Sequence, residues 1–179
     1  WYYLQSGGRR VVGVKAQIAG ATEEDLKPPL WRQISHSVIQ IVAVGAGSPV
    51  GKEVAPRELG ALAAGRTSNL LERLGFVGAD GAALLGDRER RLLVAAGAAS
   101  GLAAVYQVPI GGLVYLVEAM AAGLSLWSLY VGAVTVWTAT VTANLVIVNE
   151  PTYPVPQLPL DATTLTVAAL TGVVLTPLA

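Results

Sequence analysis

The segment best suited to chemistry is the run GAGSPVGKEVAP over residues 45–56, in which a glycine-rich break is followed by Lys52, Glu53 and Pro56. Glycine-rich turns and helix N-termini both present backbone N–H groups that bind anions. A nucleotide P-loop has similar spacing, but it requires Ser or Thr after the lysine to ligate magnesium, where this chain has Glu53. We therefore expect a small anion at this turn. Glu53 would act as a tethered anion that leaves the site when it is protonated or displaced.

The composition indicates that the elements around this turn lie in a membrane. Of 179 residues, 53% are hydrophobic and 13% are charged, about half the charged content of a typical soluble domain. Between Leu92 and Asn149 the one formally charged side chain is Glu118. About 20 apolar residues cross a bilayer, so this stretch can supply two or three spanning or half-spanning helices. We expect an integral membrane protein surrounded by lipid.

Charge and cysteine usage exclude other classes of function. Twelve Lys and Arg residues balance twelve Asp and Glu residues, so no net positive field is available to hold nucleic acid. The chain has no cysteine and one histidine, which argues against a disulfide framework and a conventional zinc centre. We expect no metal and no cofactor.

The chain lacks an initiating Met and ends just after an apolar run, so we expect an internal piece of a longer polytopic protein.

The positions of proline, glycine and charge predict an all-α protein with short, broken and tilted helices. Broken helices are tolerated at membrane depth where protein or a water-filled cavity surrounds them. The Pro-rich stretch 151–159 reads as a linker. Helices are expected over residues 31–47, 56–74, 92–105, 109–122, 127–148 and 163–175, after a short segment at 11–18.

Two motifs carry a family resemblance. Gly51-Lys52-Glu53 followed by Pro56 resembles the G-[KR]-E-G-P signature of CLC chloride channels and chloride/proton exchangers. The run RLLVAAGAASGLAAVYQVPIGGLVYLVE over residues 91–118 is similar to the family's small-residue helix, its proline break and a following helix that ends in glutamate. The resemblance implies a partial CLC-type transmembrane domain over residues 1–179. Residues 11–150 would match the first half of an inverted-repeat fold, and residues 151–179 would form a linker and the start of the next helix.

The resemblance also implies roles for individual residues. Glu53 stands at the family's gating glutamate, and the same anion motif includes Gly51, Lys52 and Val54, the last in place of the family's glycine. The family's earlier anion motif, G-S-G-I-P, falls on residues 11–15, which puts Val12 at its serine and Gly13 next to it. Because Val12 has no hydroxyl, anion selectivity stays open.

The proton side of the mechanism has two readings. Family exchangers carry an internal glutamate one position after Glu118, where this chain has Ala119. Ala119 cannot relay protons, which favours passive chloride conduction, although Glu118 could substitute on a rotated helix. The alternatives are a proton-coupled chloride exchanger and a non-conducting membrane fragment.

The resemblance further implies a voltage-gated transport protein rather than an enzyme, expected in the inner membrane of a bacterial cell. It implies a homodimer that associates through the helix ending near Met120 and the helix over residues 127–148.

Among the remaining polar residues, we interpret His36 as a hydrogen-bond donor in helix packing rather than a proton relay. Arg57 and Glu58 are adjacent and point apart, so we expect each to contact neighbouring loops.

Overall fold

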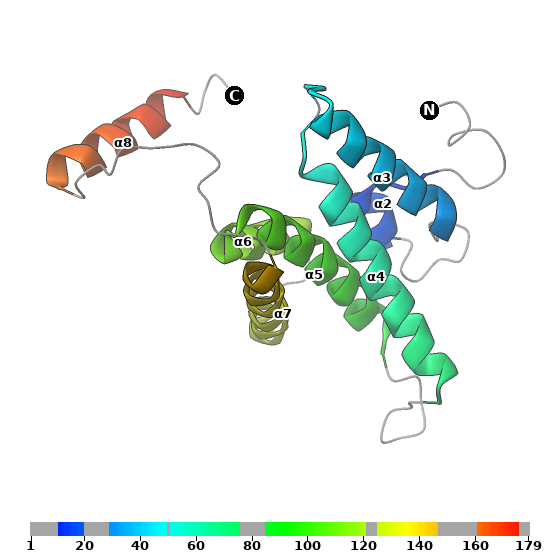
Figure 1. The fold of residues 1–179 in the computed structure, drawn as a ribbon. Coiled ribbons are helices and arrows are strands. Elements are labelled where there is room, and N and C mark those ends of the chain that lie inside the picture. Colours follow the sequence, from blue (N-terminus) through cyan, green and yellow to red (C-terminus); the bar gives the residue numbers. More distant parts are fainter. Residues whose placement is uncertain are drawn as a thin grey trace. The chain divides into compact units, whose positions relative to one another are not determined.

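The computed structural model describes residues 11–19, 29–49, 51–75, 85–120, 125–146 and 161–175, and every regular element in these ranges is a helix (Figure 1). The predicted all-α fold is therefore confirmed. The helices are α2 (Val14–Ala19), α3 (Leu30–Gly45), α4 (Val54–Arg73), α5 (Asp87–Tyr106), α6 (Pro109–Ala119), α7 (Leu126–Val146) and α8 (Ala162–Leu175).

Two helices begin two or more residues earlier than predicted. Helix α4 begins at Val54 rather than Pro56. Pro56 is its third residue, where the N–H that proline lacks would have no partner within the helix. Helix α5 begins at Asp87, five residues before the predicted start at Leu92. Acidic residues in its first turn favour the positive end of the helix dipole, and Arg90 donates a hydrogen bond to Asn69 of α4 at 3.1 Å. The predicted ends at residues 122 and 148 lie outside the described residues.

The break between α5 and α6 lies where the sequence predicts it. Gln107 follows the last residue of α5 with φ 56° and ψ 35°, a left-handed conformation that ends a helix. Pro109 then opens α6 at its first position, where a fixed φ suits a helix start.

Small residues bring α4 and α5 into close contact. A Cβ atom on Gly97 would overlap the backbone carbonyl of Gly60, and one on Gly101 would overlap that of Pro56. Beyond this contact, α5 packs on α6 and α7, and α2 packs on both α4 and α5. The buried hydrophobic core comes from α4, α5, α6 and α7. Its larger cluster includes Ala95, Ala99, Ala103, Leu116 and Val136, and a second cluster joins Ala61 of α4 to Val94 and Ala98 of α5.

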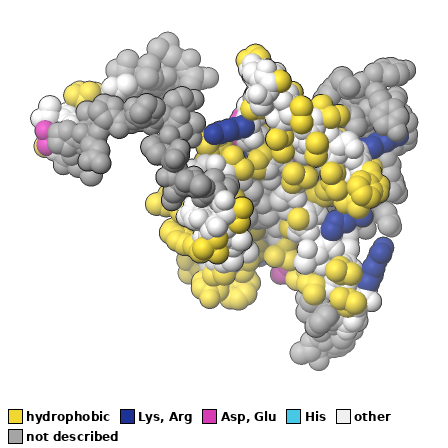
Figure 2. All heavy atoms as spheres, in the orientation of Figure 1, with side chains coloured by type: hydrophobic (Ala, Val, Ile, Leu, Met, Phe, Trp, Pro, Cys, Tyr) yellow, Lys and Arg dark blue, Asp and Glu magenta, His cyan; other side chains and the backbone are white. Residues whose placement is uncertain are grey.

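Helix α7 is, among the described residues, the one helix long and apolar enough to cross a membrane. Large hydrophobic side chains are exposed along it, among them Trp127, Trp137 and Val141. The outer face of α3 is similar, with Trp31 and Val42 exposed. Figure 2 shows these hydrophobic surfaces over α3 and α7. Such surfaces fit lipid better than water.

The chain divides into two compact units, Trp1–Val148 and Asn149–Ala179. The first contains α2 to α7 and all of the residues discussed as a site. In the second, α8 begins after Asp161, whose carboxylate accepts a hydrogen bond from the Thr164 backbone N–H at 2.8 Å. Asp161 therefore caps this short apolar helix.

Candidate functional site

Glu53 lies immediately before α4, at the helix N-terminus where the sequence predicts it. The sequence also predicts that its carboxylate lies close to the backbone N–H groups of the first turn, but the structure has no hydrogen bond between them. The reason is local, because Glu53 has helical backbone angles (φ −77°, ψ −22°), whereas a capping residue is normally extended. The carboxylate instead folds back over Gly51, where a Cβ atom would overlap it, and accepts a hydrogen bond from the Tyr106 hydroxyl at 3.3 Å.

Tyr106, the last residue of α5, contacts two neighbours in the anion motif. Besides its hydroxyl contact with Glu53, its ring lies under the Lys52 ammonium, with 4.8 Å between Nζ and the ring centroid. A cation over an aromatic face is attracted by the negative charge of the π system. The contact between residues 53 apart in sequence was missed by the sequence analysis. The local signal was an aromatic residue ending an otherwise small-residue helix.

Polar side chains fix the backbone of the turn from both sides. Gln40 of α3 donates from Nε2 to the carbonyl of Gly51 at 3.2 Å. Arg57 donates from Nε to the carbonyl of Glu53 at 3.0 Å, and its guanidinium lies 5.4 Å from the ring centroid of Tyr115. Arg57 thus contacts the turn before α4, a neighbouring loop as the sequence predicted, and it also packs on α6.

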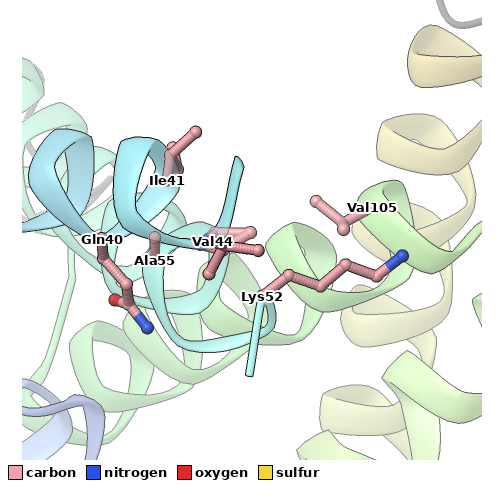
Figure 3. A pocket seen from close by; sticks show the side chains of 7 residues that line it. Gln40, Ile41, Val44, Lys52, Ala55 and Val105 are labelled. Atoms are coloured by element: carbon pink, nitrogen blue, oxygen red, sulfur yellow. The ribbon is translucent and has the colours of Figure 1, made fainter. Parts of the chain in front are cut away.

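A small, mainly apolar cavity of about 240 Å³ lies beside this turn (Figure 3). The Lys52 side chain extends along it toward the end of α5 in Figure 3. The hydrophobic lining would hold the lysine stem while the ammonium reaches Tyr106. The lining residues are Gln40, Ile41, Val44, Lys52, Ala55, Pro56 and Val105.

A larger cavity of about 530 Å³ opens between α2, α4 and α6. It brings together three residues that the sequence selected, because Gly13, Val54 and Glu118 all line it. Its charged lining residues are Lys15, Arg57, Glu58 and Glu118, and Val14, Ala16 and Tyr115 complete it. Gly51, Lys52 and Glu53 do not line this cavity, so the structure divides the predicted site between two sides of the first turn of α4.

Val12 does not line this cavity, and its backbone forms hydrogen bonds with two glutamine side chains. Its backbone N–H donates to Gln33 Oε1 at 3.0 Å, and its carbonyl accepts from Gln17 Nε2 at 2.9 Å. The first hydrogen bond joins the segment before α2 to α3, and the second joins it to α2 itself.

Glu58 forms a buried polar contact with α3. The residue is 4% exposed, and its Oε2 atom accepts from Gln33 Nε2 at 2.8 Å and lies 3.0 Å from His36 Nδ1. The predicted packing role of His36 is supported, whereas the loop contact predicted for Glu58 is wrong because its partners are helical. A signal for this contact exists in the sequence. Gln33, His36, Ser37 and Gln40 fall at helical spacing on one face of a helix in which the other residues, apart from Arg32 and Ser35, are apolar or glycine.

Comparison with known proteins gives one family. The family model described as voltage gated chloride channel matches residues 1–179. The match therefore includes the turn at 51–54, the small-residue helix α5 and both cavities. No solved structure matches the chain.

Proposed function

The chain belongs to the voltage-gated chloride channel family, whose members are integral membrane proteins that transport chloride, and on this premise we propose that Glu53 gates an anion path at the N-terminus of α4. The observation that carries the proposal is the position of Glu53, directly before the first turn of α4 but not bonded to its N–H groups. The carboxylate therefore leaves those donors to an anion.

The partners of the carboxylate fit a movable gate. The hydroxyl of Tyr106 donates to it at 3.3 Å, a long contact for an O–H donor. Lys52 places a positive charge beside the same tyrosine ring. In the position seen here the carboxylate is away from the helix end; when an ionised Glu53 moves to that end, it competes with chloride for the same N–H donors. Protonation removes that competition, so acidification should favour conduction.

Chloride efflux from liposomes, measured across a range of pH, tests the gate in the full-length protein. Glu53→Gln should give a larger efflux that depends less on pH, because the tethered competitor is gone. Glu89→Gln is the matched control, since Glu89 is an exposed glutamate at the start of another helix, α5. If Glu53→Gln lowers the yield of folded protein and leaves the pH profile unchanged, Glu53 is a structural residue and the gate is wrong.

Proton-coupled exchange is the second candidate function, and the position of Glu118 favours it. Glu118 lines the larger cavity together with Val54, the first residue of α4. Ala119, at the place of the family's internal glutamate, argues the other way. The two modes are separated by measuring whether a chloride gradient drives proton uptake into the liposomes, and whether Glu118→Gln abolishes that uptake.

We also propose a homodimer that uses α6 and α7. Both helices expose large hydrophobic side chains, including Ile110 and Val114 on α6 and Val134 on α7. These faces carry few charges, so association would depend on shape complementarity.

A further inference from the structure

Glu58 is a buried ionisable residue that the proposed gate does not use. Its two neighbours from α3, Gln33 and His36, lie 2.8 and 3.0 Å from the same carboxylate oxygen. Burying a carboxylate costs far more than burying an amide, and more still in a membrane protein. A glutamine at this position could join α3 to α4 at lower cost. The choice of a carboxylate next to an imidazole therefore indicates a role beyond packing.

The two groups form a unit that binds one proton. With an ionised carboxylate and a neutral imidazole, the pair has a net charge of −1. After one proton is added the net charge is zero, whichever group holds the proton.

The pair lies against the larger cavity, because Glu58 is part of its lining. The other titratable groups that line this cavity are Lys15 from α2, Arg57 from α4 itself, and Tyr115 and Glu118 from α6. Helix α3 contributes His36. Helix α5 meets this part of α4 with two glycines, Gly97 and Gly101, which carry no titratable side chain.

We propose that Glu58 and His36 form a proton-binding site that controls the charge facing this cavity, and that this site is separate from Glu53. When the proton is bound, the pair is neutral, and the two cations Lys15 and Arg57 outnumber the remaining carboxylate, Glu118, so that the lining favours an anion. When the proton leaves, the added negative charge opposes the anion. The proposal rests on the anion path proposed above.

Chloride efflux against pH in four forms of the full-length protein tests the site: wild type, Glu58→Gln, Glu53→Gln and the double variant. Glu58→Gln imitates the proton-bound state. It should raise efflux at alkaline pH by on the order of tenfold, as expected for removing a unit charge about 12 Å from an anion at an effective dielectric of ~20. In the Glu53→Gln background it should also remove the pH dependence that remains. Glu89→Gln again serves as the control.

The four profiles separate the two proposals. If adding Glu58→Gln to Glu53→Gln leaves the pH profile as it was, the proton-binding site is wrong, whatever Glu53 does. If Glu53→Gln has no effect but Glu58→Gln flattens the wild-type profile, the gate is wrong and the proton-binding site stands.

A second measurement covers the case in which Glu58→Gln does not fold. In wild-type protein labelled with ¹⁵N-histidine, the His36 signal can be identified by its loss in His36→Gln. The signal should change over the same pH range as chloride efflux. A His36 signal that stays constant through that range would overturn the proposal.

Discussion

Helix α4 is held by α5 on one face and by α3 on another, and the two contacts have different chemistry. Toward α5 the contact depends on missing side chains, because Gly97 and Gly101 let the backbones touch. Toward α3 it depends on hydrogen bonds from Gln33 and His36 to the buried Glu58. Close backbone packing fixes the position of a helix in lipid. A buried polar contact can change with protonation. The contact of α4 with α5 should therefore stay constant with pH, whereas its contact with α3 can change.

The largest effect is expected from breaking the glycine contact. Gly97→Val would place a side chain against the backbone of Gly60, and the resulting overpacking should lower the free energy of unfolding by about 3 kcal/mol. Thermal unfolding in detergent measures this loss.

Gly65→Ala is the matched control for that variant. Its added methyl group would meet a Val94 side-chain carbon at 3.6 Å, an ordinary contact. Alanine should therefore be neutral or stabilising by up to about 1 kcal/mol, as in a helix interior. Equal losses for the two variants would show that the glycine contact does not determine the packing of α4 on α5.

A smaller loss is expected from the polar contact. Gln33→Leu removes a donor to Glu58 and the acceptor for the Val12 N–H, which should cost about 2 kcal/mol. Ser37→Ala provides the contrast on the same face of α3. The Ser37 hydroxyl is buried and finds no hydrogen-bond partner in the described part of the chain, so its removal should be neutral or slightly stabilising. A Gln33→Leu protein as stable as wild type would contradict the hydrogen-bonded contact.

The smallest effect is expected in the second compact unit, away from both contacts. Hydrogen bonds from the backbone and side chain of Thr164 lower the pKa of Asp161 below its usual 3.8. Its capping contribution is therefore present above that value and is lost as pH falls through the lowered pKa. Helix content measured by circular dichroism at neutral pH should fall slightly in Asp161→Ala and stay unchanged in Asp161→Asn, which keeps an acceptor. An Asp161→Ala spectrum identical to wild type at neutral pH would show that the cap contributes nothing measurable.

The helices could be predicted from the sequence because their limits are marked locally. Pro109 and the glycines near residue 47 end or begin helices by their own backbone preferences. The predicted start of α5 is five residues too late, because a charged run such as 87–91 is typical of an interfacial loop as well as of a first helical turn.

The site was predictable in part. Glu53 lies at a helix N-terminus, as the sequence predicts. Gly13, Val54 and Glu118 line one cavity, and their roles there stay predictions. The contacts of Tyr106 with Glu53 and of Glu58 with His36 were not predicted. The first joins residues 53 apart in sequence, and the second joins residues 22 apart on the consecutive helices α3 and α4. The angle at which helices cross decides which side chains meet, and local sequence patterns do not give that angle. The polar stripe on α3 would have indicated a buried partner but not its identity.

The left-handed backbone at Gln107 sets a limit on how this sequence can change over evolution. Few residues other than glycine, asparagine and aspartate adopt this conformation readily, and β-branched residues pay the most for it. Gln107 follows Tyr106, whose hydroxyl reaches Glu53, and precedes the helix that carries Glu118. A substitution library at position 107 should therefore retain glycine and asparagine and lose valine and isoleucine, even though residue 107 lines neither cavity. Selection at this position would act on the backbone conformation. Residue 107 would thus limit which substitutions the protein tolerates without contacting the anion.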